Sequence, residues 1–311
     1  MRVAVLGTGG VGGYFGARLA QAGNDVVFVA RGAQLAAMRA QGLRVESAGG
    51  DIVLDRVDAT GDPAAIAPVD VVMFCVKLWD VDAAAAQVAP LVARGGIVIP
   101  FQNGVDSPAI LTRVLGEDRV LGGVAYIAAS IRAPGVISHL GSMARLRVGA
   151  FAAGPADRAQ AFVDAAKAAG IDAELSPDIR RALWEKFVFL CAFSGVTCLA
   201  RAPAGTLRAD PDLRRTFEAS MREVQAVAGV QGVDLGDEFI AGQLRLFEAL
   251  PAEMRSSMLN DLTAGHRLEA PWLCGRVVDL AVEAGLPAPV NATIYAGLKP
   301  YVMGTAGGAP H

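Results

Sequence analysis

The sequence has little charge and few aromatic residues. Charged residues make up 19% of its 311 residues, against about 25% in typical soluble domains, and Phe, Trp and Tyr together only 6%. The hydrophobic fraction is 53%, which excludes a disordered chain. Lys plus Arg is 28 and Asp plus Glu is 31, a net charge of −3, and there is no basic run that could neutralise several phosphates of a polymer. We therefore expect no nucleic acid partner.

Cysteine and histidine are also scarce, and neither is spaced for chemistry. The four cysteines are Cys75, Cys191, Cys198 and Cys274. They form no C-x-x-C pair and lie in apolar surroundings, which predicts small core residues in a reducing compartment. The three histidines show no metal-ligand spacing, and His311 is the last residue. A zinc site or a Ser-His-Asp hydrolase therefore has little support, and we expect no metal.

Long hydrophobic runs are missing as well. The N-terminus passes from Val3–Leu6 directly into Gly7, which predicts a strand and not a signal peptide, so the expected location is the cytoplasm. The most apolar long segment, 187–200, spans only 14 residues and includes Ser194 and Thr197. It is too short for a bilayer and suits a buried helix, so no membrane association is expected.

The length and the hydrophobic periodicity predict two domains. Apolar strand-like runs alternate with helical patterns at 2–7, 11–22, 25–30, 69–77, 81–92 and 96–102. Such an alternation predicts a parallel sheet with helices on both faces. Residues 42–59 alternate around Gly49-Gly50 and predict a hairpin insertion. Residues 120–150 predict several short strands, with turns at 133–135 and 140–141, as antiparallel additions to the sheet.

The period changes from 2 to 3.6 after about residue 177. Helices are predicted at 178–200, 210–228, 235–250, 255–284 in one or two pieces, and 291–302. We therefore predict an α/β domain at 1–176 and an all-helical domain at 177–311, the latter for substrate binding and dimerisation. The high apolar fraction is compatible with a homodimer that buries helices of the second domain.

A glycine-rich turn closes the first predicted strand and opens the first helix. Residues Gly7-Thr8-Gly9-Gly10-Val11-Gly12 form G-x-G-x-x-G in the strand-turn-helix context that gives this pattern its meaning. Gly7 would permit the tight turn, Gly9 would let the backbone approach a pyrophosphate, and Gly12 would let the helix pack on the strand. The first domain is therefore predicted to be a Rossmann-type doubly wound parallel sheet that binds a dinucleotide. The alternative is a glycine-rich turn without a ligand.

Arg31 follows the second predicted strand. Folds that select NAD usually place a carboxylate there, about 20 residues past the glycines, to bind the ribose 2′-hydroxyl. A guanidinium can instead pair with a 2′-phosphate. NADP(H) is the predicted cofactor, and the alternative is that Arg31 is a solvated loop charge.

Four further polar residues lie in apolar settings. Lys77 and Asn103 each follow a predicted parallel strand, at the carboxyl ends where open α/β sheets bind ligands. Lys186 is followed by a run of apolar residues, and a lysine there is costly unless it is paired or used. Glu269 could be its counter-charge. Lys77 and Glu269 could also be solvated ends of elements, and Lys186 could extend along its stem to the surface.

Together these residues resemble the ketopantoate reductase family (2-dehydropantoate 2-reductases) over roughly residues 1–300. The motifs that carry the resemblance are Gly7-x-Gly9-x-x-Gly12 with Gly16, Arg31, Val76-Lys77, Gln102-Asn103-Gly104, Trp184-x-Lys186, Pro203-x-Gly205, and Ser256-Ser257-Met258-x-x-Asp261 ahead of Glu269. The resemblance implies a Rossmann domain, a helical domain, NADPH, and reduction of a 2-keto acid on the route to pantothenate.

The resemblance also implies roles for single residues. Lys186 would be the general acid, and Glu269 would bind a substrate hydroxyl and help to place that lysine. Asn103 and Lys77 would line the cleft and bind the cofactor, Asn103 would also bind the substrate, and Ser257 would contact the substrate. A desolvated ammonium would stabilise the charge that builds on a carbonyl oxygen as its carbon accepts hydride.

The chain departs from the family at three positions that carry asparagine in well-studied members. Leu190, Ser194 and Ala204 stand there, and we expect Leu190 and Ser194 to line the substrate site. Fewer amide groups should weaken recognition of a hydroxylated keto acid. Ketopantoate is the first expected substrate. The alternatives are a reductase of a more apolar 2-keto acid, similar to a β-hydroxyacid dehydrogenase, and an NADPH sensor without chemistry.

Overall fold

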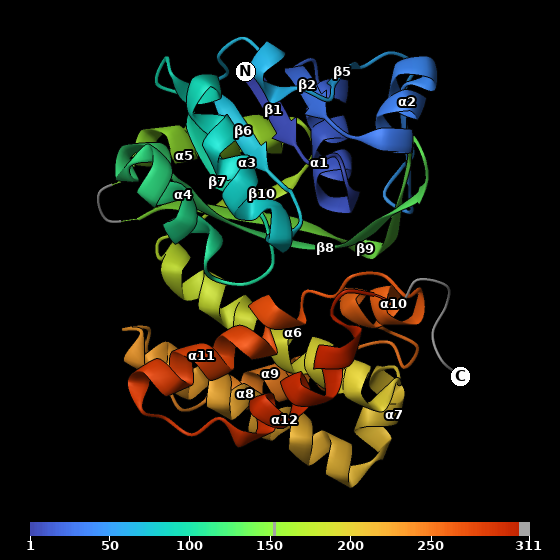
Figure 1. Cartoon of the computed structure of the whole chain (residues 1–311). Coiled ribbons are helices and arrows are strands. Elements are labelled where there is room, and N and C mark those ends of the chain that lie inside the picture. The colour runs from blue at the N-terminus through green and yellow to red at the C-terminus, as the bar shows by residue number, and fades with distance from the viewer. Residues whose placement is uncertain (152–153, 305–311) are drawn as a thin grey trace. The chain divides into compact units, whose positions relative to one another are not determined.

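The computed structural model of the protein describes residues 1–151 and 154–304 (Figure 1). A five-stranded parallel sheet forms the centre of the first part of the protein. Its strand order is β5-β2-β1-β6-β7, with β1 at Arg2–Leu6, β2 at Asp25–Val29, β5 at Asp58–Thr60, β6 at Val71–Phe74 and β7 at Ile97–Pro100. Every residue of β6 and β7 is buried, as expected for a parallel sheet covered on both faces. The predicted Rossmann-type doubly wound sheet is confirmed.

The chain runs outward from β1 through β2 to β5 and then returns to β6 on the other side of β1. The carboxyl ends of β1 and β6 therefore form the switch point of the sheet, where folds of this type bind ligands. The helices of this part are α1 (Gly10–Gln21), α2 (Gly32–Gln41), α3 (Val81–Val88), α4 (Ser107–Leu115) and α5 (Ala156–Ala168). α3 ends at Val88 because Pro90 has no N–H for an α-helical bond, and a 3-10 turn, Ala89–Val92, follows it.

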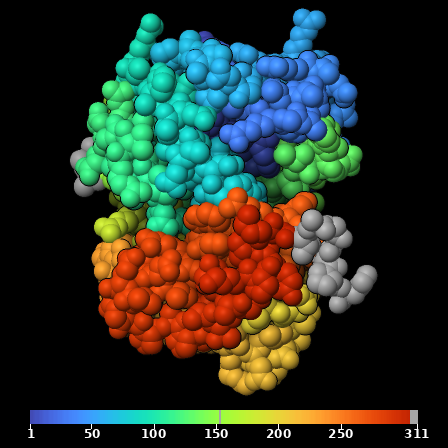
Figure 2. Space-filling view, viewed as in Figure 1, coloured from blue at the N-terminus to red at the C-terminus, as the bar shows by residue number. Residues whose placement is uncertain are grey.

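A second sheet, of order β10-β9-β3-β4 with β8 paired to β9, lies in the same part of the chain. Its strands are β3 (Leu43–Ser47), β4 (Ile52–Leu54), β8 (Leu121–Ala133), β9 (Val136–Ala150) and β10 (Asp172–Leu175). β3 and β4 form the predicted hairpin. In Figure 2 the green tip of the β8–β9 pair adjoins the blue N-terminal segments, in line with the pairing of β3 with β9.

The prediction of several short strands over 120–150 was wrong. β8 and β9 are two long strands that turn at Gly135, and Leu140-Gly141 is not a turn between strands. The pairing shifts register after Ile127, so that Ala128 faces Leu140 while Ile127 faces Ala144. The extra residues of β9 are absorbed there as an irregularity within one strand. The pair belongs to the second sheet and does not extend the parallel one.

The second part of the protein is helical, as predicted. It contains α6 (Ile179–Ala200), α7 (Ala204–Ala209), α8 (Pro211–Val230), α9 (Phe239–Glu248), α10 (Ser257–Thr263), α11 (Cys274–Ala284) and α12 (Pro289–Leu298), with 3-10 turns at Ala270–Trp272 (η5) and Lys299–Tyr301. The pattern predicted over 255–284 is divided into α10 and α11, and Pro271 lies in the 3-10 turn between them.

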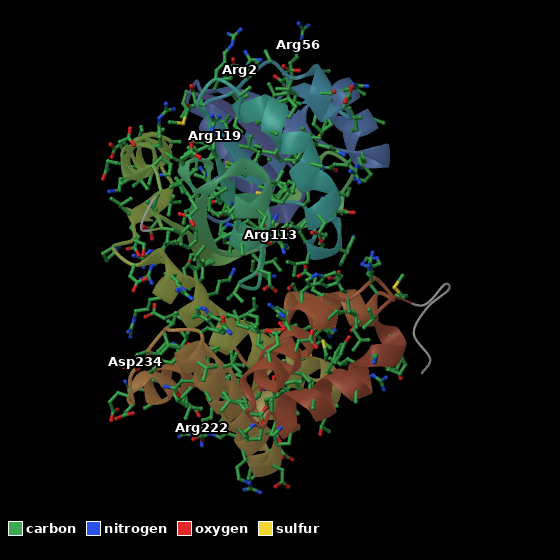
Figure 3. The ribbon with its side chains drawn as sticks, turned by 60° about the vertical axis from the view of Figure 1, so that its left-hand side comes forward. Arg2, Arg56, Arg113, Arg119, Arg222 and Asp234 are labelled. Atoms are coloured by element: carbon green, nitrogen blue, oxygen red, sulfur yellow. The ribbon has the colours of Figure 1, made fainter. Side chains whose placement is uncertain are left out.

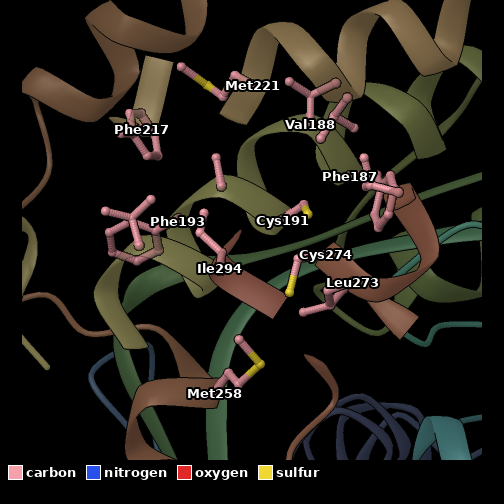
Figure 4. Packing of buried hydrophobic residues seen from close by; sticks show 14 of the residues in the cluster. Phe187, Val188, Cys191, Phe193, Phe217, Met221, Met258, Leu273, Cys274 and Ile294 are labelled. Carbon is pink, nitrogen blue, oxygen red and sulfur yellow. The ribbon is translucent and has the colours of Figure 1, made fainter. Parts of the chain in front are cut away.

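The core of this helical part is built around α6, α8 and α11 (Figure 4). Phe187 and Phe217 are almost fully buried in it, as are the thiols of Cys191 and Cys274. Burial raises the pKa of Cys274 to about 12, so it remains a neutral thiol. All four cysteines are free. Charged residues such as Arg56 and Arg222 are exposed (Figure 3).

The chain divides into two compact units at a different point from the predicted 176/177 boundary. The first unit comprises Met1–Gln102 and Asp106–Leu183, and the second comprises Asn103–Val105 and the chain from Trp184. The first turn of α6 belongs to the first unit because Ile179 packs beside Gly122 and Gly149, where an added Cβ would meet it at 2.5 and 2.9 Å. Asn103–Val105 belongs to the helical unit, and Val105 packs against its core.

α6 matches the helix predicted at 178–200 to within one residue and extends beyond its most apolar segment, 187–200. With 22 residues it is long and apolar enough to cross a membrane, but 72% of its most apolar window is buried inside the structure. Length and composition alone do not distinguish a buried core helix of this kind from a membrane span.

Candidate active site

The glycine turn after β1 contains two kinds of glycine. Gly7 and Gly12 are required by the packing of the protein itself, whereas Gly9 is not. Gly7 has φ +101°, and a Cβ there would lie 2.7 Å from the Cys75 carbonyl. At Gly12 a Cβ would overlap the Gly7 carbonyl oxygen and approach Val5 Cγ1 to 2.8 Å. At Gly9, by contrast, no described atom other than those of Gly9 and its two chain neighbours lies within 4 Å of the Cβ position. The space beside Gly9 is therefore open, as a close approach of a pyrophosphate requires.

The other residues of the turn hold it in place. Thr8 is buried, and both its backbone N and its Oγ1 donate to Val29 O at 3.0 Å, which fastens the turn to β2. A Cβ at Gly10 would overlap the backbone of Ala129 in β8. Gly10 and Val11 open α1, before the first helical bond from Gly13 N to Gly9 O. Their amides therefore lie at the positive end of the helix, where anions bind.

Arg31 and Lys77 lie on the same unit as the glycine turn. Arg31 is exposed at the N-cap of α2. It lines a pocket of about 450 Å³ together with Gly61, Asp62, Pro63, Ala64, Ala86, Gln87 and Pro90. Lys77 follows β6 and is exposed, with its Nζ 5.5 Å from the centre of the Trp79 ring. The open cradle at Gly9, the helix N-terminus and the cationic Arg31 fit the pyrophosphate and the 2′-phosphate of NADP(H).

Three of the predicted site residues meet on the helical unit. Lys186 Nζ donates to Asn103 Oδ1 at 3.1 Å, and Asn103 Nδ2 donates to Glu269 Oε2 at 3.3 Å. The amide of Asn103 thus joins an ammonium to a carboxylate. Glu269 is only 9% exposed, and Lys186 and Asn103 are partly buried.

Different elements bring these side chains together. Lys186 lies in α6, and Glu269 is the N-cap of the 3-10 turn η5. Asn103 leaves the end of β7 just before Gly104, whose φ of +89° turns the backbone and would leave a Cβ 3.5 Å from Trp272 O. Only a glycine adopts this conformation readily, so Gly104 allows the chain after β7 to approach η5.

The environment of Lys186 changes the acidity of its ammonium. Desolvation by burial lowers the pKa of Lys186 from 10.5 to about 8, and the negative charge of Glu269 opposes this by raising it. Desolvation is the larger effect. The ammonium is therefore largely protonated near neutral pH and gives up its proton far more readily than an ordinary lysine, as a general acid requires.

The remaining predicted substrate residues also lie on the helical unit. Leu190 and Ser194 follow Lys186 by one and two helical repeats and so share its face of α6. Leu190 is partly buried against the core, and Ser194 is 1% exposed, with no hydrogen bond to its Oγ among the described residues. Ser257 is exposed at the start of α10, and its neighbour Ser256 is the N-cap and hydrogen-bonds to Thr197 at 2.8 Å.

One polar residue at the carboxyl end of β7, in the first unit, was not among the predicted site residues. Gln102 was quoted only as part of the Gln102-Asn103-Gly104 motif, but its Nε2 donates to Phe74 O and Val76 O at the end of β6. A polar residue directly at the carboxyl end of a buried strand was the available signal. Within the described part of the chain, no group of three or more His, Cys, Asp or Glu residues could hold a metal ion.

Both parts of the chain match models of one protein family. Residues 3–153 match the family described as "Ketopantoate reductase PanE/ApbA", and residues 178–302 match its C-terminal domain. The chain belongs to the ketopantoate reductase family. It is therefore an oxidoreductase of the class that acts on CH–OH and C=O groups, in a family that uses NADPH.

Several known proteins are similar to the chain over nearly its whole length. A 2-dehydropantoate 2-reductase from Nostoc sp. is 31% identical, over 96% of this chain and 94% of that protein. An uncharacterized oxidoreductase, YkpB, from Bacillus subtilis is 29% identical, over 97% and 99%. The crystal structure of a PanE/ApbA family ketopantoate reductase from Ralstonia eutropha has a TM-score of 0.88 and 32% identity, over 97% and 98%.

Proposed function

We propose that the chain reduces the carbonyl of a 2-keto acid with NADPH, with ketopantoate as the first candidate substrate and Lys186 as the proton donor. The observation that carries the proposal is the hydrogen-bonded set of Lys186, Asn103 and Glu269, together with a pKa of about 8 at the lysine. The open cradle at Gly9 and the position of Arg31 support NADPH as the cofactor.

Reduction of the carbonyl takes one hydride and one proton. NADPH held at the glycine turn would supply the hydride that the carbonyl carbon accepts. The Lys186 ammonium donates a proton to the carbonyl oxygen as negative charge builds on it, and the lysine then regains a proton from solvent. Asn103 holds the ammonium through its Oδ1, and Glu269 opposes the loss of the proton before the substrate is reduced. Glu269 also offers a carboxylate oxygen to a hydroxyl of the substrate.

A second candidate is a reductase of a more apolar 2-keto acid. Leu190 is packed against the hydrophobic core, and Ala204 is fully buried, so two of the three positions that carry asparagine in other family members offer no side-chain hydrogen bond. A pocket without polar groups discriminates weakly between a substrate with a hydroxyl and one without. A pocket that hydrogen-bonds the substrate hydroxyl, by contrast, strongly rejects analogues that lack that hydroxyl.

Ketopantoate and its analogue without the hydroxyl, 3,3-dimethyl-2-oxobutanoate, separate these two functions. The kcat/KM of each is measured by following NADPH oxidation with purified protein. A preference for ketopantoate of roughly tenfold or more supports the first candidate, since a hydrogen bond to a charged group contributes about 1.5–3 kcal/mol. An equal or higher kcat/KM for the analogue supports the second. Tight NADPH binding without turnover of any 2-keto acid would contradict both and indicate an NADPH sensor.

A further inference from the structure

The side chain of Gln102 has one end fixed and one end unused. Its Nε2 donates to Phe74 O at 2.9 Å and to Val76 O at 3.1 Å. Carbonyl oxygens can only accept, so these two bonds settle which end of the amide is nitrogen. Oε1 therefore points away from the β6 carbonyls. It is buried, and no hydrogen-bond donor reaches it among the described residues. A buried amide oxygen without a donor is costly, so its retention calls for a partner.

Gln102 is also next to the glycine turn through the end of β6. Gly7 packs against Cys75 and Val76, with a Cβ position only 2.7–2.8 Å from their backbone atoms, and Gln102 holds the carbonyl of the same Val76. All of these residues belong to the first unit. The unused Oε1 is thus on the β6–β7 side of the switch point, whereas Arg31 follows β2 on the other side of β1.

A dinucleotide bound across the switch point places its two halves on opposite sides of the glycine turn. Arg31 on the β2 side is the group suited to the phosphorylated adenosine ribose, so the nicotinamide nucleoside belongs on the β6–β7 side. That nucleoside carries hydrogen-bond donors in its ribose hydroxyls and in its carboxamide. Either group could donate to Gln102 Oε1, which has no donor among the described residues.

We propose that Gln102 Oε1 accepts a hydrogen bond from the nicotinamide nucleoside of NADPH, which makes Gln102 a cofactor-binding residue. This inference rests on the proposed cofactor. The two bonds from Nε2 orient the amide before the cofactor arrives, so that binding costs little ordering of the side chain.

The test compares three ligands by isothermal titration calorimetry, with wild-type protein and Gln102→Met, which keeps the length of the side chain and removes the amide. 2′,5′-ADP lacks the nicotinamide nucleoside, 2′-phospho-ADP-ribose has its ribose but not its base, and NADPH has both. We expect the Kd of 2′,5′-ADP to be unchanged and that of NADPH to rise about five- to tenfold in the variant. A similar rise for 2′-phospho-ADP-ribose identifies the ribose hydroxyls as donors, and no rise identifies the carboxamide.

Gln34→Leu is the matched control for a purely structural glutamine. Gln34 Nε2 donates to Thr8 O at 3.3 Å and its Oε1 accepts from Gly135 N at 2.8 Å, so both ends of its amide are used within the protein. Any effect of Gln34→Leu should be equal for the three ligands. If Gln102→Met gives that uniform pattern, or no change with any ligand, the proposal is overturned. If the wild-type protein binds none of the three ligands, it is the proposed cofactor, and with it the proposed function, that fails.

Discussion

Lys186 Nζ donates a hydrogen bond to the side-chain oxygen of Asn103 at 3.1 Å, and the same amide reaches Glu269 through its nitrogen at 3.3 Å. A neutral residue therefore separates the ammonium from the carboxylate along this chain of bonds. This arrangement leaves the lysine subject to desolvation while the carboxylate compensates only in part. The acidity of the lysine then depends on Asn103 remaining uncharged.

Asn103→Asp tests that dependence. A carboxylate in hydrogen-bond contact with Lys186 favours the ammonium, and opposite charges this close raise a lysine pKa by about one unit or more. We expect the high-pH limb of kcat/KM to move upward by a similar amount and kcat at neutral pH to fall. Asn103→Ser adds no charge, so its limb should stay near the wild-type position. Coincident pH profiles for Asn103→Asp and the wild type would show that Asn103 does not set the acidity of the lysine.

The pH dependence of reduction follows from the lowered pKa of Lys186. The acid form is needed, so kcat/KM should be highest below about pH 8 and fall as pH rises through that value. Glu269→Gln removes the charge that raises this pKa, and the fall should then begin at lower pH. Steady-state NADPH oxidation measures both profiles. A shift to higher pH in Glu269→Gln would contradict the assigned sign, and an unchanged NADPH Kd shows that the cofactor site is intact.

Gly9 and Gly12 form a matched pair at the cofactor turn. Gly9→Ala adds a methyl group where no described atom beyond the chain neighbours lies within 4 Å, so the free energy of unfolding should change little while NADPH binding weakens at least tenfold. Gly12→Ala forces a methyl group against Gly7 and Val5 and should lower the free energy of unfolding by roughly 1–3 kcal/mol. Denaturant unfolding and NADPH titration measure the two effects. Normal NADPH binding by Gly9→Ala would mean that no phosphate approaches this glycine.

Arg31 is expected to select NADPH over NADH. Arg31→Asp exchanges a partner of the 2′-phosphate for a group that repels it, and the preference for NADPH, measured as a ratio of Kd values, should fall roughly 10- to 100-fold. Arg56→Asp makes the same change of charge at another exposed arginine of the first unit and should leave the ratio nearly unchanged. Equal ratios in Arg31→Asp and Arg56→Asp would make Arg31 a solvated loop charge.

The sequence allowed the fold to be predicted where one kind of pattern dominated. Continuous apolar strands between helical patterns predicted the parallel sheet, and the sustained helical period predicted the second unit. The long strands β8 and β9 were missed because Gly141 looks like a turn residue, and only the register of the partner strand shows that the irregularity stays within β9. The boundary between the two units, which falls inside α6, could not be predicted either, because it depends on the residues that Ile179 packs against.

The candidate site could be predicted only in part, because its remaining features also depend on contacts between segments far apart in the sequence. Lys186 and Glu269 stood out as charges in apolar segments, and their partnership through Asn103 required the fold. Thr8 lay in the cofactor motif, yet its hydroxyl is used by Val29 within the protein. The unused oxygen of Gln102 becomes visible only when hydrogen bonds are assigned. The cytoplasmic location and the homodimer stay predictions.

Loss of the ammonium tests the central claim most directly. NADPH oxidation with ketopantoate and with 3,3-dimethyl-2-oxobutanoate is measured from about pH 6 to pH 10 for the wild type and Lys186→Ala, with the NADPH Kd of each protein determined alongside. We predict that Lys186→Ala binds NADPH normally, loses roughly 10²- to 10⁴-fold in kcat, and no longer shows the fall in activity near pH 8. A variant that keeps wild-type kcat, or keeps that fall, would contradict the assignment of Lys186 as the proton donor.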